Sequence, residues 1–404
     1  MTSASSSIDE LLREAMIAHR AGRMAVAEMG YRRVLRQRQD DPKALHFLGL
    51  LLFHEGDRLG GIAHLSRSLE CQPDNARGWN ALGGMLIAVD RPAEAARAYL
   101  RATEVAPAHA EGWYNLGICK RDAGNLQSAE AHLRTAIACD PGYFRAHEAL
   151  AMLCYQLGRI DEAAAAYARW ARLDPASAKA RHMAAAASGQ NVPARASDEY
   201  VRELFDSAAA EFETNLAQLQ YRAHHSVVTA LVERIGASPL DSVLDAGCGT
   251  GLCGPLLRPH CRHLVGVDLS ARMLELAKFR RCYDELAAAE LTAFMRARPS
   301  SFDAVTAADT LVYFGALEDA LSAAHDTLRA GGWLVFTLEA LSGVSAASYE
   351  LQIHGRYAHG ESYVRSALDA AGFETESLSY ETPRRERDED VRGMRVVARR
   401  RALL

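Results

Sequence analysis

The sequence contains no long uninterrupted run of apolar residues. No window approaches the roughly 18 uncharged apolar residues that a membrane-spanning helix requires. The N-terminal stretch MTSASSSIDE is polar and lacks the apolar segment of a secretory signal peptide. These absences argue against export and against a membrane partner, so we expect a cytoplasmic protein.

Paired cysteines and a strong charge of one sign are missing too. The eight cysteines include no C-x-x-C pair, which argues against a zinc site or a disulfide framework, and we expect no metal. Cys248 and Cys253 flank a glycine-rich stretch and could be a redox pair, but buried thiols are the favoured interpretation. The net charge of -5 provides no general attraction for a nucleic acid, so none is expected as a partner.

A repeat of 34 residues organises the first part of the chain. Pro73, Pro107, Pro141 and Pro175 follow one another at this spacing, which is the period of tetratricopeptide repeats. Between the prolines, small and aromatic residues recur in the same register, and we count about five copies. Residues 8–189 therefore resemble tetratricopeptide-repeat proteins, with 176–189 as a final capping helix.

In such a stack, glycine and alanine let paired helices approach, larger side chains fill the gaps, and neighbouring repeats bury one continuous core. The resemblance implies an all-α solenoid whose concave groove binds a peptide or a protein. The alternative is a scaffold for folding or oligomerisation, which leaves a homo-oligomer open. Residues 190–199 contain a proline and mostly polar side chains, and they predict a linker to a second domain.

The stretch VLDAGCGTGLCG, residues 243–254, fits two different cofactors. Its glycines include the G-x-G-x-x-G pattern of dinucleotide-binding turns, in which a pyrophosphate rests on a helix N-terminus. Asp245, however, precedes this turn, and a carboxylate there would repel a diphosphate. S-adenosylmethionine carries no phosphate and has an ammonium group that a carboxylate attracts. The electrostatics therefore favour S-adenosylmethionine over NAD.

Asp268 ends the second predicted strand, where a carboxylate can bind both ribose hydroxyls, and this suits either cofactor. The segment that follows supports S-adenosylmethionine. Ser270 is the predicted N-cap of the next helix, and Met273, one turn in, is placed to pack on an adenine. Through these motifs, residues 200–404 resemble class I S-adenosylmethionine-dependent methyltransferases.

The resemblance implies an α/β Rossmann-like domain with a mostly parallel seven-stranded sheet and an antiparallel last strand. Together with the repeats, it is similar to bacterial repeat-containing methyltransferases. It implies S-adenosyl-L-methionine as the cofactor. The expected cofactor-binding residues are Asp245, Ala246, Gly247, Cys248, Gly249, Gly251, Asp268, Leu269, Met273, Glu290, Leu291 and Asp309.

The catalytic residues are less clearly marked. An oxygen or nitrogen nucleophile can need a general base, and His359 and His354 lie in the segment expected to roof the acceptor site. Tyr313 is predicted near the end of a strand and is a third candidate. The alternative for His359 is that it orders its own loop. The charged run RRERDED, residues 384–390, is interpreted as a solvated hairpin loop rather than a binding patch.

The resulting hypothesis is a methyltransferase whose repeats recruit a peptide, a protein or a carrier-bound substrate to the catalytic domain. A second hypothesis is an adaptor whose methyltransferase-like domain binds the cofactor without catalysis. A third, an NAD-dependent oxidoreductase, rests only on the literal G-x-G-x-x-G pattern.

Overall fold

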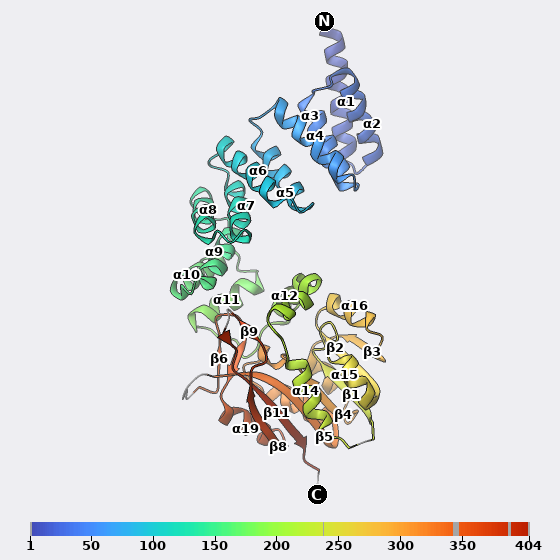
Figure 1. The fold of residues 1–404 in the computed structure, drawn as a ribbon, viewed down its shortest axis with the longest axis vertical. Coiled ribbons are helices and arrows are strands. Elements are labelled where there is room, and N and C mark those ends of the chain that lie inside the picture. The colour runs from blue at the N-terminus through green and yellow to red at the C-terminus, as the bar shows by residue number, and fades with distance from the viewer. Residues whose placement is uncertain (1, 237, 342–346, 387–388, 403–404) are drawn as a thin grey trace. The chain divides into compact units, whose positions relative to one another are not determined.

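The computed structural model describes residues 2–236, 238–341, 347–386 and 389–402 (Figure 1). The chain divides into two compact units, Met1–Leu173 and Asp174–Leu404. Within the described ranges, no helix has the length and apolarity needed to cross a membrane. The two units are built on different plans.

The first unit is entirely helical. In its described part, consecutive helices pack against each other in five pairs joined by short turns. The pairs are α1 (Thr2–Arg20) with α2 (Met24–Gln37), α3 (Pro42–His54) with α4 (Arg58–Cys71), α5 (Ala76–Ile87) with α6 (Pro92–Val105), α7 (Ala110–Asp122) with α8 (Leu126–Cys139), and α9 (Phe144–Gln156) with α10 (Ile160–Leu173).

Glycine allows the close packing within these pairs, as the repeat pattern predicts. A Cβ atom on Gly83 of α5 would lie 2.4 Å from the ring of Tyr99 on α6, which is closer than real contacts allow. A Cβ on Gly49 of α3 would lie 2.8 Å from the carbonyl oxygen of Gly61 on α4. Any larger residue at these positions would push the paired helices apart.

One hydrogen bond recurs with the 34-residue period. The indole Nε1 of Trp79 donates to the carbonyl oxygen of Pro73 at 2.9 Å, and that of Trp113 donates to Pro107 at 2.8 Å. One period later, His147 Nε2 lies 3.1 Å from the carbonyl oxygen of Pro141. Each side chain therefore ties the first helix of a pair to the turn that precedes it.

The second unit begins earlier than the expected boundary at residue 189. It includes α11 (Ala178–Ser188), the helix predicted to cap the repeats, and His182 of α11 lies 2.9 Å from the carbonyl oxygen of Gly355. Residues 190–199 are bound to the same unit. The carbonyl oxygen of Ala194 accepts hydrogen bonds from the backbone of Gly315 and Ala316 at 2.9 and 2.8 Å. The predicted linker is thus a fixed part of the second unit, because its backbone groups find partners there.

The second unit is an α/β domain. Its helices after α11 are α12 (Asp198–Ala208), α13 (Phe212–Gln218), α14 (Ala223–Val232), α15 (Gly254–Leu257), α16 (Ala271–Phe279), α17 (Leu291–Arg296), α18 (Glu318–Thr327) and α19 (Glu361–Ala370). Its strands are β1 (Leu240–Ala246), β2 (Cys261–Asp268), β3 (Glu285–Ala288), β4 (Phe302–Ala307), β5 (Leu328–Ala340), β6 (Tyr349–Leu351), β7 (Tyr357–His359), β8 (Phe373–Glu381), β9 (Arg385–Glu386), β10 (Glu389–Asp390) and β11 (Gly393–Arg400).

The main sheet has the predicted topology. Seven strands follow the order β3-β2-β1-β4-β5-β11-β8. The first five pair in parallel, and β11 lies antiparallel between β5 and β8. The short β7 pairs in parallel with the end of β5 and antiparallel with β6. The expected fold, helical repeats followed by a Rossmann-like domain, is confirmed.

Helices cover both faces of this sheet. Leu244 of β1 faces the core that packs against α17, α18 and α19, whereas the adjacent Val243 faces the core under α14 and α15. This alternation follows from the two-residue period of a strand. The carboxyl ends of β1, β2 and β4 therefore meet at one edge of a three-layer domain, where parallel sheets place their ligands.

Candidate active site

A cavity of about 300 Å³ lies at the carboxyl ends of the parallel strands. One side of it consists of the glycine turn after β1 and the residues that follow β2, β3 and β4. The opposite side consists largely of apolar side chains from α12 and α13. Two arginines, Arg356 and Arg384, and the pair Tyr221 and His224 complete the lining.

The glycine turn is held tightly against its neighbours. Gly247 has a positive φ of 72°, and a Cβ atom there would lie 2.3 Å from Oγ1 of Thr310. The backbone N–H groups of Gly247 and Cys248 donate to the carbonyl oxygen of Val267 at 2.8 and 3.0 Å. Only glycine fits at position 247, and the turn it permits brings backbone to the cavity wall.

Asp268 lies where the sequence places it, at the end of β2 and on the cavity wall. Its carboxylate accepts hydrogen bonds from the backbone N–H groups of Gly249 and Ser270 at 2.9 and 2.8 Å. Burial raises the pKa of Asp268, and these backbone hydrogen bonds partly offset the rise. The carboxylate is thus fixed in orientation and retains lone pairs that can accept from a ligand.

Glu290 and Leu291 also line the cavity, but the Glu290 carboxylate has a structural partner. It caps α17 by accepting from the backbone N–H groups of Thr292 and Ala293 at 3.1 and 2.7 Å. Arg195 lies 3.5 Å from it. Burial would raise the pKa of Glu290, but the hydrogen bonds from α17 and the charge of Arg195 lower it.

The predicted cofactor residues divide into two groups. Those that line the cavity are Gly247, Cys248, Gly249, Asp268, Leu269, Glu290, Leu291 and Asp309. Asp245, Ala246, Gly251 and Met273 are not part of the lining. The Met273 side chain is fully buried, so its expected place against an adenine is not seen.

Asp245 differs most from its expected role. It lies two residues after Val243, so its side chain points toward the same face of the sheet, under α14 and α15. There the Tyr283 hydroxyl donates to its carboxylate at 2.6 Å. Burial raises the pKa of Asp245 to about 6, despite this hydrogen bond. The expectation that Asp245 faces a cofactor ammonium is therefore not supported by the geometry.

His359, one of the predicted catalytic bases, also lies away from the cavity. It is fully buried, and its Nε2 lies 2.9 and 3.1 Å from the carbonyl oxygens of Phe314 and Gly315. Its ring stacks on Tyr363 with an interplanar angle of 9°. Burial lowers the pKa of His359 to about 4. These contacts assign His359 to ordering the β7 loop, the alternative that the sequence left open.

Of the other two catalytic candidates, one lines the cavity and the other does not. His354 is not part of the cavity lining, and its Nε2 contacts the Glu339 carboxylate at 3.1 Å. Tyr313 does line the cavity, where Phe205 of α12 packs edge-on against it at 5.5 Å between ring centroids. Burial raises the pKa of Tyr313. Of the three, only Tyr313 can meet a ligand in this cavity.

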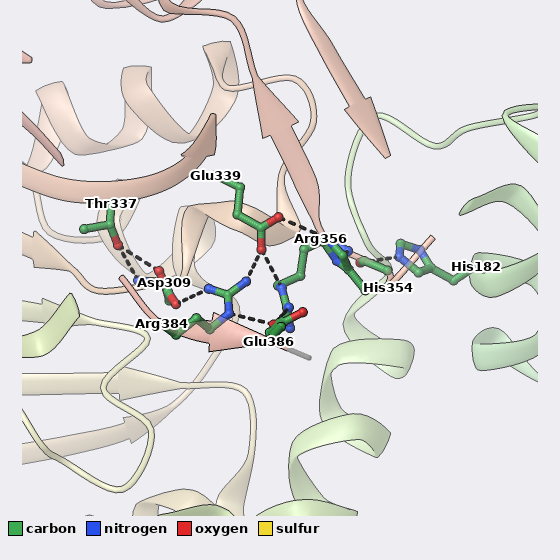
Figure 2. Close-up of polar contacts among 9 residues, drawn as sticks. His182, Asp309, Thr337, Glu339, His354, Arg356, Arg384 and Glu386 are labelled. Atoms are coloured by element: carbon green, nitrogen blue, oxygen red, sulfur yellow. Dashed lines mark hydrogen bonds and ion pairs between the residues drawn. The ribbon is translucent and has the colours of Figure 1, made fainter. Parts of the chain in front are cut away.

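The charged run 384–390 lies between β8 and β11 as predicted, and the side chains of Arg385 and Asp390 are exposed, but the run is not simply a solvated loop. Residues 387–388 lie outside the described residues, but Arg384 is only 3% exposed and lines the cavity. Its guanidinium contacts Asp309 at 2.7 Å, Glu386 at 2.8 Å, and Glu339 (Figure 2). Arg384 could not be identified from the sequence because two of its acidic partners are distant along the chain: Asp309 follows β4, and Glu339 lies in β5.

Asp309 is held by the same group of side chains. It has a positive φ of 51°, which is uncommon for a residue other than glycine. Thr337 Oγ1 accepts from the Asp309 backbone N–H at 2.8 Å and donates to its carboxylate at 3.0 Å (Figure 2). These contacts with Thr337 and Arg384 stabilise a backbone conformation that is otherwise strained.

The start of α14 and the residues just before it bring a second pair, Tyr221 and His224, to the cavity. The ring of His224 stacks on that of Tyr221 at 5.3 Å between centroids and an angle of 11°. Burial and the neighbouring His225 lower the pKa of His224 to about 4. The imidazole is therefore neutral at physiological pH. Both residues occur in the sequence cluster YRAHH, residues 221–225. This cluster follows Phe205 and Phe212, and that proximity in sequence is what could have indicated a role at the cavity.

Comparison with known proteins agrees with this architecture. Residues 244–336 match the methyltransferase domain family, and residues 81–144 and 120–178 match the tetratricopeptide repeat family. The chain is thus a tetratricopeptide-repeat protein with a class I methyltransferase domain.

Individual relatives cover parts of the chain. A malonyl-[acyl-carrier protein] O-methyltransferase of Enterobacter lignolyticus is 30% identical over 172 residues, which are 42% of this chain and 66% of that protein. The peroxisomal targeting signal receptor of Eremothecium gossypii is 33% identical over 98 residues, 24% of this chain and 17% of the receptor. The crystal structure of MamA protein covers 43% of this chain and 96% of its own, with 20% identity and a TM-score of 0.40.

Proposed function

We propose that this repeat-containing methyltransferase transfers a methyl group from S-adenosyl-L-methionine to an oxygen or nitrogen atom of an acceptor that the repeats recruit. The observation that carries the proposal is Asp268, a buried carboxylate fixed by two backbone hydrogen bonds at the cavity wall. Such a group suits the two hydroxyls of a ribose. The glycine turn beside it gives a ligand direct access to the backbone.

The residues present fit this cofactor. Leu269, Ala289 and Leu291 form an apolar part of the wall that suits an adenine, next to the Asp268 carboxylate. The helix after the glycine turn, α15, has only four residues. Its dipole is small, so it offers little to the diphosphate of NAD. The wall beside Asp268 therefore suits the adenosine of S-adenosylmethionine, and the short α15 argues against NAD. Neither argument depends on Asp245.

When bound, S-adenosylmethionine supplies a methyl group that is already activated by the sulfonium. The protein then has to align the acceptor and exclude water. The apolar side chains of Phe205, Phe212 and Leu216 keep one side of the cavity dry. Tyr313 and His224 are placed to orient an acceptor at the polar side. At neutral pH, Tyr313 would donate a hydrogen bond, and His224 would serve as a neutral partner.

The acceptor is proposed to be a peptide, a protein or a carrier-bound molecule. Tetratricopeptide repeats support an interaction with a protein, and related methyltransferases act on an acyl-carrier protein. The first acceptor to test is therefore malonyl-acyl carrier protein, followed by other carrier-bound acids. Formation of S-adenosylhomocysteine is the readout, with Asp268→Asn as the inactive control.

An adaptor without catalysis is a second candidate. The observation in its favour is that two of the three predicted catalytic residues, His354 and His359, do not line the cavity. An adaptor would bind S-adenosylmethionine but form no S-adenosylhomocysteine with any carrier protein or cell lysate. Formation of the product that depends on both an acceptor and Asp268 would exclude the adaptor.

A further inference from the structure

We propose that Arg356 and Arg384 form a binding site for a carboxylate of the acceptor, and that the side chain of Glu386 fills this site until the acceptor displaces it. This inference rests on the proposed function, because it names the chemical class of the acceptor. Figure 2 shows the polar contacts among these side chains.

The two guanidinium groups share two carboxylates. Glu339, at the end of β5, accepts from Arg356 Nε at 2.7 Å and also from Arg384. Glu386 accepts from Arg384 Nε at 2.8 Å and also from Arg356 (Figure 2). In each case a single carboxylate oxygen receives hydrogen bonds from both arginines. The arginine pair therefore provides two binding positions for carboxylates, one occupied by Glu339 and the other by Glu386.

The charges within this group show that one carboxylate is in excess. Two guanidinium groups face three carboxylates, those of Asp309, Glu339 and Glu386. Without Glu386, the two remaining carboxylates would balance the arginines. Exchange of the Glu386 carboxylate for that of a ligand changes no net charge, so it avoids the large cost of leaving a buried charge unpaired.

Glu386 is also the least firmly held of the three. Its side chain is 24% exposed, compared with 4% for Glu339 and 15% for Asp309. Glu339 has an additional contact with His354 at 3.1 Å, and Asp309 is fixed by Thr337. Glu386 lies in the two-residue strand β9, which pairs only with the equally short β10 among the described residues.

The arginine pair is reachable from the cavity. Arg356 and Arg384 both belong to its lining, together with the apolar side chains of Leu219 and Phe205. Burial would lower the pKa of Arg384, but Asp309, Glu339 and Glu386 raise it, so the guanidinium stays charged. A ligand for such a site combines an apolar chain with a terminal carboxylate.

The test uses the full-length chain with octanoate as the probe and octanamide as its uncharged counterpart. Calorimetry should show that Glu386→Gln increases the affinity for octanoate about tenfold, because a competing charged hydrogen bond is weakened. Asp390→Asn is the matched control. It removes an exposed carboxylate of the same hairpin that contacts Arg385 rather than the arginine pair, so the affinity should stay unchanged.

A second measurement on the wild-type chain guards against a folding defect of the variant. Octanoate should increase hydrogen exchange in a peptide containing residues 383–386, since Glu386 leaves the arginines, whereas octanamide should not. The proposal is overturned if Glu386→Gln binds octanoate no more tightly than the wild type, or if octanoate leaves exchange in this peptide unchanged. Neither measurement contains S-adenosylmethionine, so failure of the proposed function would be seen separately, as absent cofactor binding or methyl transfer.

Discussion

The arginine at the centre of the buried charge group offers the sharpest test of the site geometry. Arg384 contacts three carboxylates and is only 3% exposed. Replacement by methionine keeps much of the volume but leaves Asp309, Glu339 and Glu386 with too little positive charge. Removal of one partner from a buried ion pair typically costs about 3–5 kcal/mol. We expect Arg384→Met to lower the free energy of unfolding of the second unit at pH 7 by this amount.

The effect should depend on pH. Burial would raise the pKa values of Glu339 and Glu386, but both lie below their usual value of 4.5. The hydrogen bond with His354 and the charges of the two arginines lower the pKa of Glu339, and the two arginines lower that of Glu386. A carboxyl group with a lowered pKa in the folded state stabilises the protein above pH 4.5, and this stabilisation is lost as the pH falls through the folded pKa. The difference between wild type and variant should therefore shrink below pH 4.5.

The assay is urea unfolding followed by hydrogen exchange in peptides from β5 and β11, which report on the second unit alone. Arg385→Met is the control, because Arg385 and its partner Asp390 are 42% and 65% exposed. Exposed ion pairs contribute about 0–1 kcal/mol. A loss below about 1 kcal/mol for Arg384→Met at pH 7, or equal losses for both variants, would refute the buried charge group.

Two further predictions concern His359 and Asp245, which were expected at the cavity but do not line it. His359→Phe should lose about 1–3 kcal/mol at pH 7 through the unpaired carbonyls of Phe314 and Gly315, yet keep its affinity for S-adenosylmethionine. The pKa of His359 in the folded wild type is about 4, below its usual value of 6.5, so the wild type should lose about 3 kcal/mol of unfolding free energy as the pH falls from 6.5 to 4. The variant lacks the imidazole and should not show this loss. A variant that folds but does not bind S-adenosylmethionine would contradict the placement of His359 away from the cavity. Asp245 has the opposite sign, since its pKa is raised from 3.8 to about 6, so its stabilisation is complete below pH 3.8 and lost above 6. Asp245→Asn should therefore remove a loss of about 3 kcal/mol between pH 4 and 7 in urea titrations, and an unchanged pH profile would show that Asp245 is not buried as described.

Features that depend on local spacing could be predicted from the sequence. The 34-residue period of the prolines predicts the helical pairs. In three of these pairs a glycine lies against a larger side chain of the partner helix, namely Gly49 against Leu65, Gly83 against Tyr99 and Gly117 against Leu133. The glycine turn and Asp268 follow from a strand, a turn and a second strand in succession. These contacts join residues within one repeat or one βαβ unit.

Features that depend on how distant segments fold together could not be predicted. The charged run 384–390 reads as solvated because its sequence neighbours are polar, but Arg384 is neutralised by Asp309 and Glu339, 75 and 45 residues away. From the sequence, His359 is a plausible catalytic base in a loop. In the folded chain, however, its ring contacts the carbonyl oxygens of Phe314 and Gly315. The orientation of Asp245 depends on Tyr283, which reaches it from beyond the second strand.

Calorimetric titration of the full-length chain with S-adenosylmethionine tests the central claim most directly. We predict one binding site, at least tenfold weaker binding for Asp268→Asn because two charged hydrogen bonds to the ribose are weakened, and no binding of NAD. Binding of NAD, or S-adenosylmethionine affinity that is the same in the wild type and in Asp268→Asn, would contradict the account.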